Sequence, residues 1–164
     1  MDEEAFDAFY RASFTRLVSQ IYAMCGNLAE AQDCVQEAFI RAWDKRKQLD
    51  EQQSPEAWVR TVAHRLAVSR WRRTVKALRP PDRAREPAMP REPDPTRVAL
   101  VRALAQLPEN QRHAIVCFHL CDMSVADIAA EVGAPIGTIK ARLSRARTTL
   151  ATLLSDDLLE DSHV

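Results

Sequence analysis

The residues best suited to chemistry lie between Ser124 and Leu150, where two helical patterns are separated by Gly133. Glycine tolerates positive φ, so Gly133 can reverse the chain between them. Apolar residues at helical spacing predict the buried faces of the two helices: Ala126, Ile128, Ala129 and Val132 on the first, and Ile136, Ile139, Leu143 and Ala146 on the second. The outer face of the second helix then carries Thr138, Lys140, Arg142, Ser144, Arg145 and Arg147. A helix that presents cations and hydroxyls outward in this way suits the major groove of DNA.

A second group of cations lies in the middle of the chain. It consists of Arg60, His64, Arg65, Arg70, Arg72 and Arg73, with Trp71 among them. Residues 60–85 carry a net charge of +8 and residues 134–154 a net charge of +4, although the whole chain is neutral. Two separated basic blocks predict two contacts with one polyanion. The alternative is a pair of solvated helix faces.

The elements that position these residues all read as helices, since no segment shows strand-like alternation. Apolar spacing predicts helices over 4–25 and 29–46, and a third from Pro55 to about Val75, capped by Ser54, that buries Trp58, Val62, Leu66 and Ser69. Six of the 21 residues in 76–96 are proline, which predicts an extended linker. A further helix starts at Val98, and another covers Gln111–Leu120 after the break at Pro108. We therefore expect an all-α fold of two small helical domains, 1–75 and 97–154, joined by a proline-rich linker (76–96), with a helix-turn-helix in the second domain and an acidic, frayed tail over 155–164.

Other classes of function find little support in the residues. His113, Cys117 and Cys121 follow one another at i, i+4 and i+8, but i and i+8 lie ~12 Å apart on a helix. These residues therefore do not form one metal site, and we expect the cysteines to pack in the core as reduced thiols, with no metal and no cofactor. No nucleophile motif or phosphate-binding loop is present, which argues against an enzyme. The acidic N-terminus lacks the pattern of a signal peptide, and no run reaches the ~20 apolar residues of a membrane span, so we expect a cytoplasmic protein.

Three segments together resemble one family, the bacterial RNA polymerase sigma factors of the extracytoplasmic-function (ECF) type. Asp33–Trp43 is similar to the family's core-polymerase-binding helix, and Pro55–Arg73 to the helix that engages and melts the −10 element. Leu107–Leu150 resembles the domain that binds the −35 element. The resemblance implies a factor that gives core RNA polymerase its promoter specificity.

The resemblance also implies roles for single residues. The polymerase-facing positions are Asp33, Gln36, Glu37, Ile40 and Arg41, and the −10 contacts are Arg60, His64, Arg65, Arg70, Arg72 and Arg73. In the second domain, Lys140, Ala141, Ser144 and Arg145 match base-facing positions, while Thr138, Arg142 and Arg147 match phosphate contacts. The segment from about Lys45 to Ser54 supplies the base pocket in this family. Arg65 and Ser69 replace a common asparagine and aspartate, so the −10 preference of this chain is open.

The partners implied by the resemblance are the clamp coiled coil of the largest polymerase subunit, the flap of the second-largest subunit, promoter DNA and an anti-sigma protein. The competing interpretation is a free-standing helix-turn-helix regulator that binds operator DNA without polymerase. The basic block at 60–85 favours the polymerase-dependent factor, because a dimerisation module has no use for it.

Overall fold

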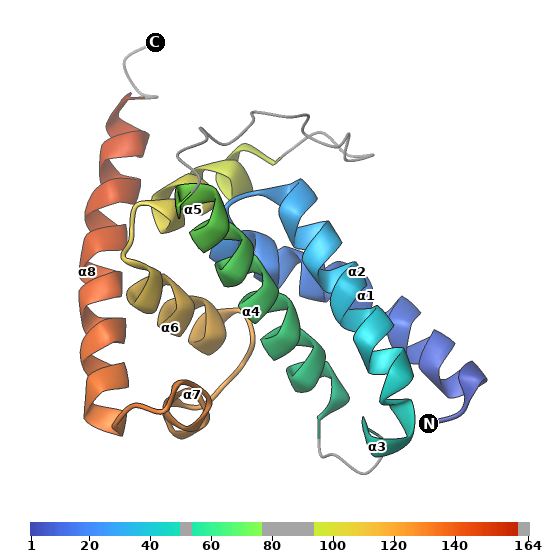
Figure 1. The fold of residues 1–164 in the computed structure, drawn as a ribbon. Helices are drawn as coiled ribbons and strands as arrows, with labels where there is room; N and C mark the ends of the chain where they lie inside the picture. Colours follow the sequence, from blue (N-terminus) through green and yellow to red (C-terminus); the bar gives the residue numbers. More distant parts are fainter. Residues whose placement is uncertain (50–53, 77–93, 161–164) are drawn as a thin grey trace. The chain divides into compact units, whose positions relative to one another are not determined.

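A computed structural model describes residues 1–49, 54–76 and 94–160, without the side chains at 71, 72, 74–76 and 157–160. Within these ranges all regular secondary structure is helical, as predicted (Figure 1). The chain divides into two compact units, residues 1–89 and 90–164. None of the described helices is long and apolar enough to cross a membrane. The predicted extended linker lies almost wholly outside the described residues.

The first unit consists of α1 (Glu3–Cys25), α2 (Leu28–Asp44), the short α3 (Arg46–Leu49) and α4 (Pro55–Lys76). Helices α1, α2 and α4 pack against one another, and their shared core includes the fully buried Leu17, Ile21, Val35 and Val59. Aromatic rings of α1 surround Phe39 of α2, the nearest being Tyr10 with ring centroids 4.9 Å apart. The packing leaves the opposite face of α2 for other contacts.

Sharp signals in the sequence set the ends of these helices. Gly26 has φ of +73°, a conformation that glycine adopts without strain, and it ends α1. Asn27 then caps α2 by accepting a hydrogen bond from the Glu30 N–H. The Ser54 hydroxyl accepts from the Ala57 N–H at 3.2 Å, which confirms Ser54 as the cap of α4.

The buried face of α4 differs from the prediction. Val59, Ala63 and Ala67 are buried, whereas Trp58, Val62 and Leu66 are only half-buried and Ser69 is exposed. Small alanines allow α4 to approach α2 closely, so the core follows the alanine positions and not the large side chains beside them. The prediction also missed α3, which follows directly after the end of α2 at Asp44.

The second unit contains α5 (Pro95–Ala105), α6 (Glu109–His119), α7 (Val125–Val132) and α8 (Ile136–Glu160). Helix α5 begins before the predicted Val98, because Asp94 caps it and Pro95 takes its first position. Both α5 and α6 pack on α8. Helix α8 also runs further than expected: it continues through Glu160, so the first part of the acidic tail is helical.

The helix-turn-helix is formed by α7 and α8, as predicted. Ser124 caps α7, and Gly133 reverses the chain with φ of +69°. Ile128 and Ala129 of α7 are buried. Ala126, Val132 and Ile136 were expected in the core but are exposed; Ala126 lies in the first turn of α7, Val132 ends α7 and Ile136 begins α8.

Candidate nucleic-acid interface

The outer face of α8 carries the cations predicted from the sequence. Ile139, Leu143, Ala146 and Leu150 are buried and fix the rotation of the helix about its axis. On the other side, Lys140, Ser144, Arg145 and Arg147 are exposed, while Thr138, Ala141 and Arg142 are half-buried. All seven predicted residues therefore lie on the solvent side of one helix, with no acidic side chain among them.

Helix α6 orients one edge of this face. The Arg147 guanidinium lies over the Phe118 ring at 5.4 Å from its centroid. Phe118 is a residue of α6, so this contact holds the Arg147 side chain of α8 against the neighbouring helix. A basic face held in this way on a rigid helix can bind the DNA backbone without first being ordered.

The cations of α4 are less uniform than the sequence suggested. Arg65 and Arg73 are exposed and His64 is half-buried, while the side chain of Arg72 is outside the described residues. Arg60 is only 7% exposed, so little of its side chain is accessible to DNA in the free unit. It lies on the buried side next to Val59, where its charge helps to lower the pKa of Glu56.

Arg70 has a partner inside the unit. Its Nη1 atom lies 3.3 Å from Oε1 of Glu30 on α2. The same carboxylate accepts a hydrogen bond from the buried Cys34 thiol at 3.5 Å. Burial raises the pKa of the Cys34 thiol to about 12, with the Glu30 charge adding to the rise. Arg70 thus links α4 to α2, and this ion pair competes with the predicted role of Arg70 toward DNA.

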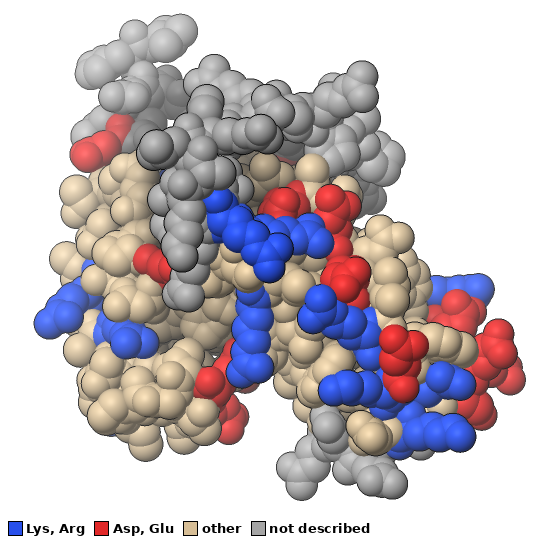
Figure 2. All heavy atoms as spheres, in the orientation of Figure 1, with Lys and Arg blue, Asp and Glu red and all other residues tan. Residues whose placement is uncertain are grey.

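A basic cluster lies at the end of α2, at the start of the segment from about Lys45 to Ser54, which was identified from the sequence without a role for its charges. It consists of Lys45, Arg46 and Lys47, and the Lys45 Nζ atom lies 5.8 Å from the centroid of the Trp58 ring. Arg46 stacks on the Trp43 ring at 4.1 Å and donates to the Trp43 carbonyl oxygen. Figure 2 shows Lys and Arg side chains gathered where α2 ends and α3 begins, close to acidic side chains. The signal in the sequence was the run Lys45–Lys47, which opens the segment named as the base pocket.

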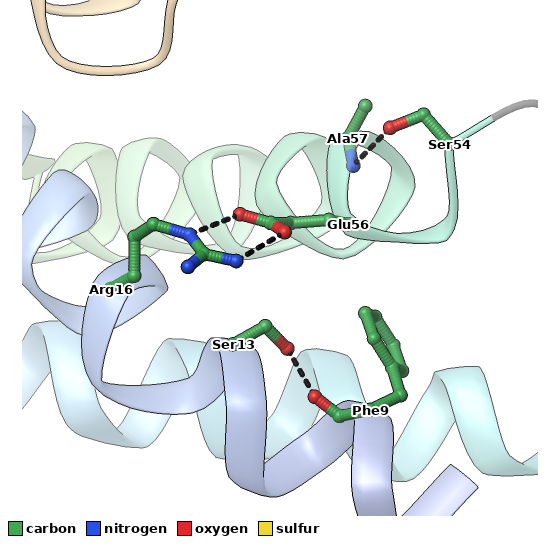
Figure 3. A network of polar contacts seen from close by, with 6 residues as sticks. All are labelled: Phe9, Ser13, Arg16, Ser54, Glu56 and Ala57. Carbon is green, nitrogen blue, oxygen red and sulfur yellow. Dashed lines mark hydrogen bonds and ion pairs between the residues drawn. The ribbon is translucent and has the colours of Figure 1, made fainter. Parts of the chain in front are cut away.

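Two contacts hold α3 and the start of α4 in the first unit. Leu49 is only 1% exposed and anchors α3 in the core. On the far side, Arg16 of α1 forms two hydrogen bonds with the Glu56 carboxylate, at 2.8 and 2.7 Å (Figure 3). The Arg16 guanidinium holds the pKa of Glu56 below its usual range. The fork holds the first turn of α4 against α1.

The predicted polymerase-facing stripe lies on α2, opposite its buried face. Asp33, Gln36, Ile40 and Arg41 are exposed, and Ile40 keeps 56% of its surface accessible. Glu37 is half-buried and pairs with Arg41 at 3.0 Å. Val35 and Phe39 face the core, as predicted, whereas Trp43 is half-buried. The stripe is therefore a polar surface with one large apolar side chain in it.

The cysteines fall into two classes. Cys34 and Cys117 are completely buried, and the Cys117 Sγ atom lies 3.5 Å from Nε2 of His113. Cys25 and Cys121 are half-exposed, in contrast to the expectation that all four pack in the core. Among the described residues, no three His, Cys, Asp or Glu side chains come together in a way that could hold a metal ion.

Comparison with known proteins gives two family models, each on one unit. Residues 9–77 match Sigma-70 region 2, and residues 97–150 match Sigma-70, region 4. The chain is 31% identical to the ECF RNA polymerase sigma factor EcfG of Rhodopseudomonas palustris, over 85% of this chain and 79% of that protein. It is also 31% identical to the ECF RNA polymerase sigma factor RpoE of Cereibacter sphaeroides, over 94% of this chain and 88% of the relative.

Solved structures give the same result for the fold. The sigma factor RpoE of Bartonella quintana, crystallised with the anti-sigma factor NepR, is 28% identical with a TM-score of 0.75, over 93% of this chain and 98% of that one. CnrH, solved in complex with the cytosolic domain of CnrY, is 21% identical to this chain, with a TM-score of 0.70. The match covers 95% of this chain and 91% of CnrH, and at this identity it supports a shared fold alone.

Proposed function

The chain belongs to the sigma-70 family as an ECF RNA polymerase sigma factor, and we propose that its two units divide promoter recognition between them. The single observation that carries the proposal is the presence of one outward-facing basic helical surface in each unit. Promoter DNA is a polyanion with two separated elements, and each basic surface fits one of them. Sigma factors are in general non-enzymatic DNA-binding regulators, and we propose that this chain likewise catalyses no reaction of its own.

The first unit is proposed to bind core polymerase and to open the −10 element. The stripe on α2 around Ile40 fits the clamp coiled coil of the largest subunit, because an exposed apolar side chain within a polar helical face is typical of a protein interface. Opening DNA requires cations for the phosphates and flat side chains for the unpaired bases. Arg65 and Arg73 on α4 supply the cations, and the Lys45–Lys47 cluster beside Trp58 adds both kinds of group next to the segment before Ser54.

The second unit is proposed to bind the −35 element through α8 and to contact the flap of the second-largest subunit. Arg145 is exposed and can pair with a guanine edge, while Ala141 offers a methyl group to a thymine methyl. Lys140 and Ser144 belong with them to the base-facing positions, while Thr138, Arg142 and Arg147 suit the phosphates on either side of the groove. The free-standing regulator is not favoured, since the matches cover both polymerase-dependent regions of the sigma-70 family.

An anti-sigma protein is the proposed regulator. The similar sigma factor of Bartonella quintana is held by such a partner in its co-crystal structure. We propose that a partner of this class covers the α2 stripe or the α8 face of this chain and so prevents assembly with polymerase. The proposed place of action is the cytoplasm, where bacterial polymerase and DNA are found.

The division between the units can be tested on one promoter with the reconstituted holoenzyme. Arg145→Ala is expected to weaken binding to the −35 element. The holoenzyme concentration that gives half of the maximal hydroxyl-radical protection there should rise about tenfold, because one direct base contact is worth ~1–3 kcal/mol. The substitution leaves permanganate reactivity at the −10 element intact once the complex is formed. Arg65→Ala is expected to reduce permanganate reactivity while −35 protection persists. Loss of both signals in both variants contradicts the division.

A further inference from the structure

The exposed Arg147 side chain of α8 is held by an aromatic ring. The central carbon of its guanidinium lies 5.4 Å from the centroid of the Phe118 ring on α6. Arg16 in the first unit, by contrast, lies 2.7 Å from the carboxylate of Glu56. Among the residues that the structure describes, no carboxylate forms an ion pair with Arg147. The partner of this cation within its own unit is therefore a neutral ring.

The fold of the second unit fixes the place of this ring. Phe118 lies in the last turn of α6, directly after the completely buried Cys117. The backbone after α6 folds back on this turn, where the Met123 N–H donates to the Cys117 carbonyl oxygen at 3.1 Å. The Phe118 side chain is half-buried, and its ring meets the His119 ring edge-on with the centroids 5.0 Å apart. The ring is therefore in place before any DNA binds.

A guanidinium that is held by a ring keeps its hydrogen-bond donors for another partner. Arginine carries five N–H donors, and attraction to a ring face pairs none of them with an oxygen acceptor. A carboxylate occupies two donors at once, as Glu56 does with Arg16. The phosphate oxygens of DNA accept the same pair of donors. The contact with Phe118 therefore restrains Arg147 and leaves its donors for a phosphate.

Arg147 also lies where such a restraint affects binding. It follows the buried Ala146 and lies four residues after the buried Leu143, so it projects from the edge of the outer face of α8 that adjoins α6. A long side chain loses rotamer freedom when an interface immobilises it, and this loss opposes binding. A ring that already limits the positions of the guanidinium in the free protein reduces the loss.

We infer that Phe118 is a positioning residue for DNA binding by the second unit, on the premise that α8 binds the −35 element as proposed above. Its ring holds the Arg147 guanidinium at the edge of α8, where the guanidinium donates to a phosphate of the −35 element. Helix α6 thus contributes to −35 binding through a side chain of α8, and Phe118 acts without a DNA contact of its own.

The test is a double-mutant cycle in the full chain, assembled with core polymerase. Phe118→Leu keeps an apolar side chain and removes the ring, Phe118→Tyr keeps the ring, and Arg147→Gln removes the cation. Arg112→Gln is the control for one lost charge, since Arg112 lies on α6 and its Nη1 atom donates to the Ala105 carbonyl oxygen at 3.4 Å. The probe is a promoter fragment that wild-type holoenzyme transcribes. The readouts are the holoenzyme concentration for half protection of the −35 element, its salt dependence, and the melting temperature of the free protein.

We expect Phe118→Leu to raise the concentration for half protection by about two- to fivefold, the range for a cation–π contact at an exposed site. Phe118→Tyr is expected to leave this concentration unchanged. Arg147→Gln should reduce the slope of log affinity against log salt by about 0.9, the value for one phosphate contact, and Arg112→Gln should reduce it by less. In the Arg147→Gln background, Phe118→Leu is expected to have no further effect on protection.

A merely structural role for Phe118 predicts a different pattern. Phe118→Leu would then lower the melting temperature and weaken −35 protection equally with and without Arg147, and that result overturns the inference. Equal losses of protection for Phe118→Leu and Phe118→Tyr also overturn it, because tyrosine keeps the ring. If wild-type holoenzyme gives no −35 protection at all, the proposed function fails, and the inference falls with its premise.

Discussion

The stripe on α2 makes a quantitative prediction for Ile40→Ala. Within the described part of the first unit, Ile40 is the one large apolar side chain with most of its surface exposed, at 56%. It contributes little to the core of the unit, so its removal is expected to change the free energy of unfolding by less than ~0.5 kcal/mol. Any larger effect of the substitution must then come from a partner.

The size of that effect follows from the exposed surface. Complete burial of an isoleucine side chain is worth about 1.5–3 kcal/mol. Roughly half of the Ile40 side chain is exposed in the free protein, so burying that half against polymerase contributes ~1 kcal/mol to the binding free energy. Truncation to alanine removes most of this contribution. We therefore expect affinity for core polymerase to fall about fivefold.

The assay is a fluorescence titration of labelled protein with core polymerase in the absence of DNA. Thr15→Ala is the matched control, since Thr15 is exposed on α1, outside the predicted polymerase face. Urea unfolding of both variants checks that the fold is intact. Unchanged affinity for Ile40→Ala, or an equal loss for Thr15→Ala, would refute the assignment of this face.

Three further predictions concern single side chains. The Arg16–Glu56 fork is partly exposed, and a double-mutant cycle by urea unfolding is expected to give ~0.5–1 kcal/mol of coupling. Pairing with Arg16 lowers the pKa of Glu56. The coupling energy is therefore fully present above the ordinary glutamate pKa of about 4.3 and is lost as the pH falls through the lowered pKa of Glu56. A coupling energy that persists in full at a pH well below the lowered pKa would contradict this prediction. Asp122 has φ of +52°, so Asp122→Gly is expected to raise the melting temperature by a few degrees, whereas a decrease would show that the aspartate side chain stabilises this turn. The side chain of Cys34 is buried and its pKa is raised to about 12, so at pH 8 a thiol reagent should modify the half-exposed Cys25 well before Cys34. Mass spectrometry of the digested protein measures the two modification rates, and equal rates would contradict this order.

The helices and their caps were accessible to sequence reasoning because their causes are local. Ser54, Gly133 and the apolar spacing of α8 each fix structure within one or two turns, and the structure bears them out. The outer face of α8 follows from the same spacing, since knowledge of the buried side determines the opposite side. The residues predicted for the outer face of α8 are therefore exposed or half-buried in the structure, and their contact with DNA stays a prediction.

The errors concern features that depend on packing between helices. Arg60 is buried beside Val59 on α4, and no periodicity of α4 alone predicts its burial. The ion pair of Arg70 with Glu30 joins residues that are 40 positions apart. A count of charges includes both arginines among the cations available to DNA, whereas in the folded unit Arg60 is buried and Arg70 pairs with Glu30. The segment that begins at Lys45 was named from the sequence, but not the contact of Lys45 with Trp58, because the two residues come together only on folding.

The central claim is that promoter recognition by this chain depends on core polymerase. The most direct measurement is run-off transcription on fragmented genomic DNA, with purified core polymerase and with or without the protein. We predict discrete new transcripts that start downstream of a shared two-part motif, and only when both the protein and core polymerase are present. The absence of such transcripts, together with tight binding of duplex DNA by the protein alone, would contradict the account.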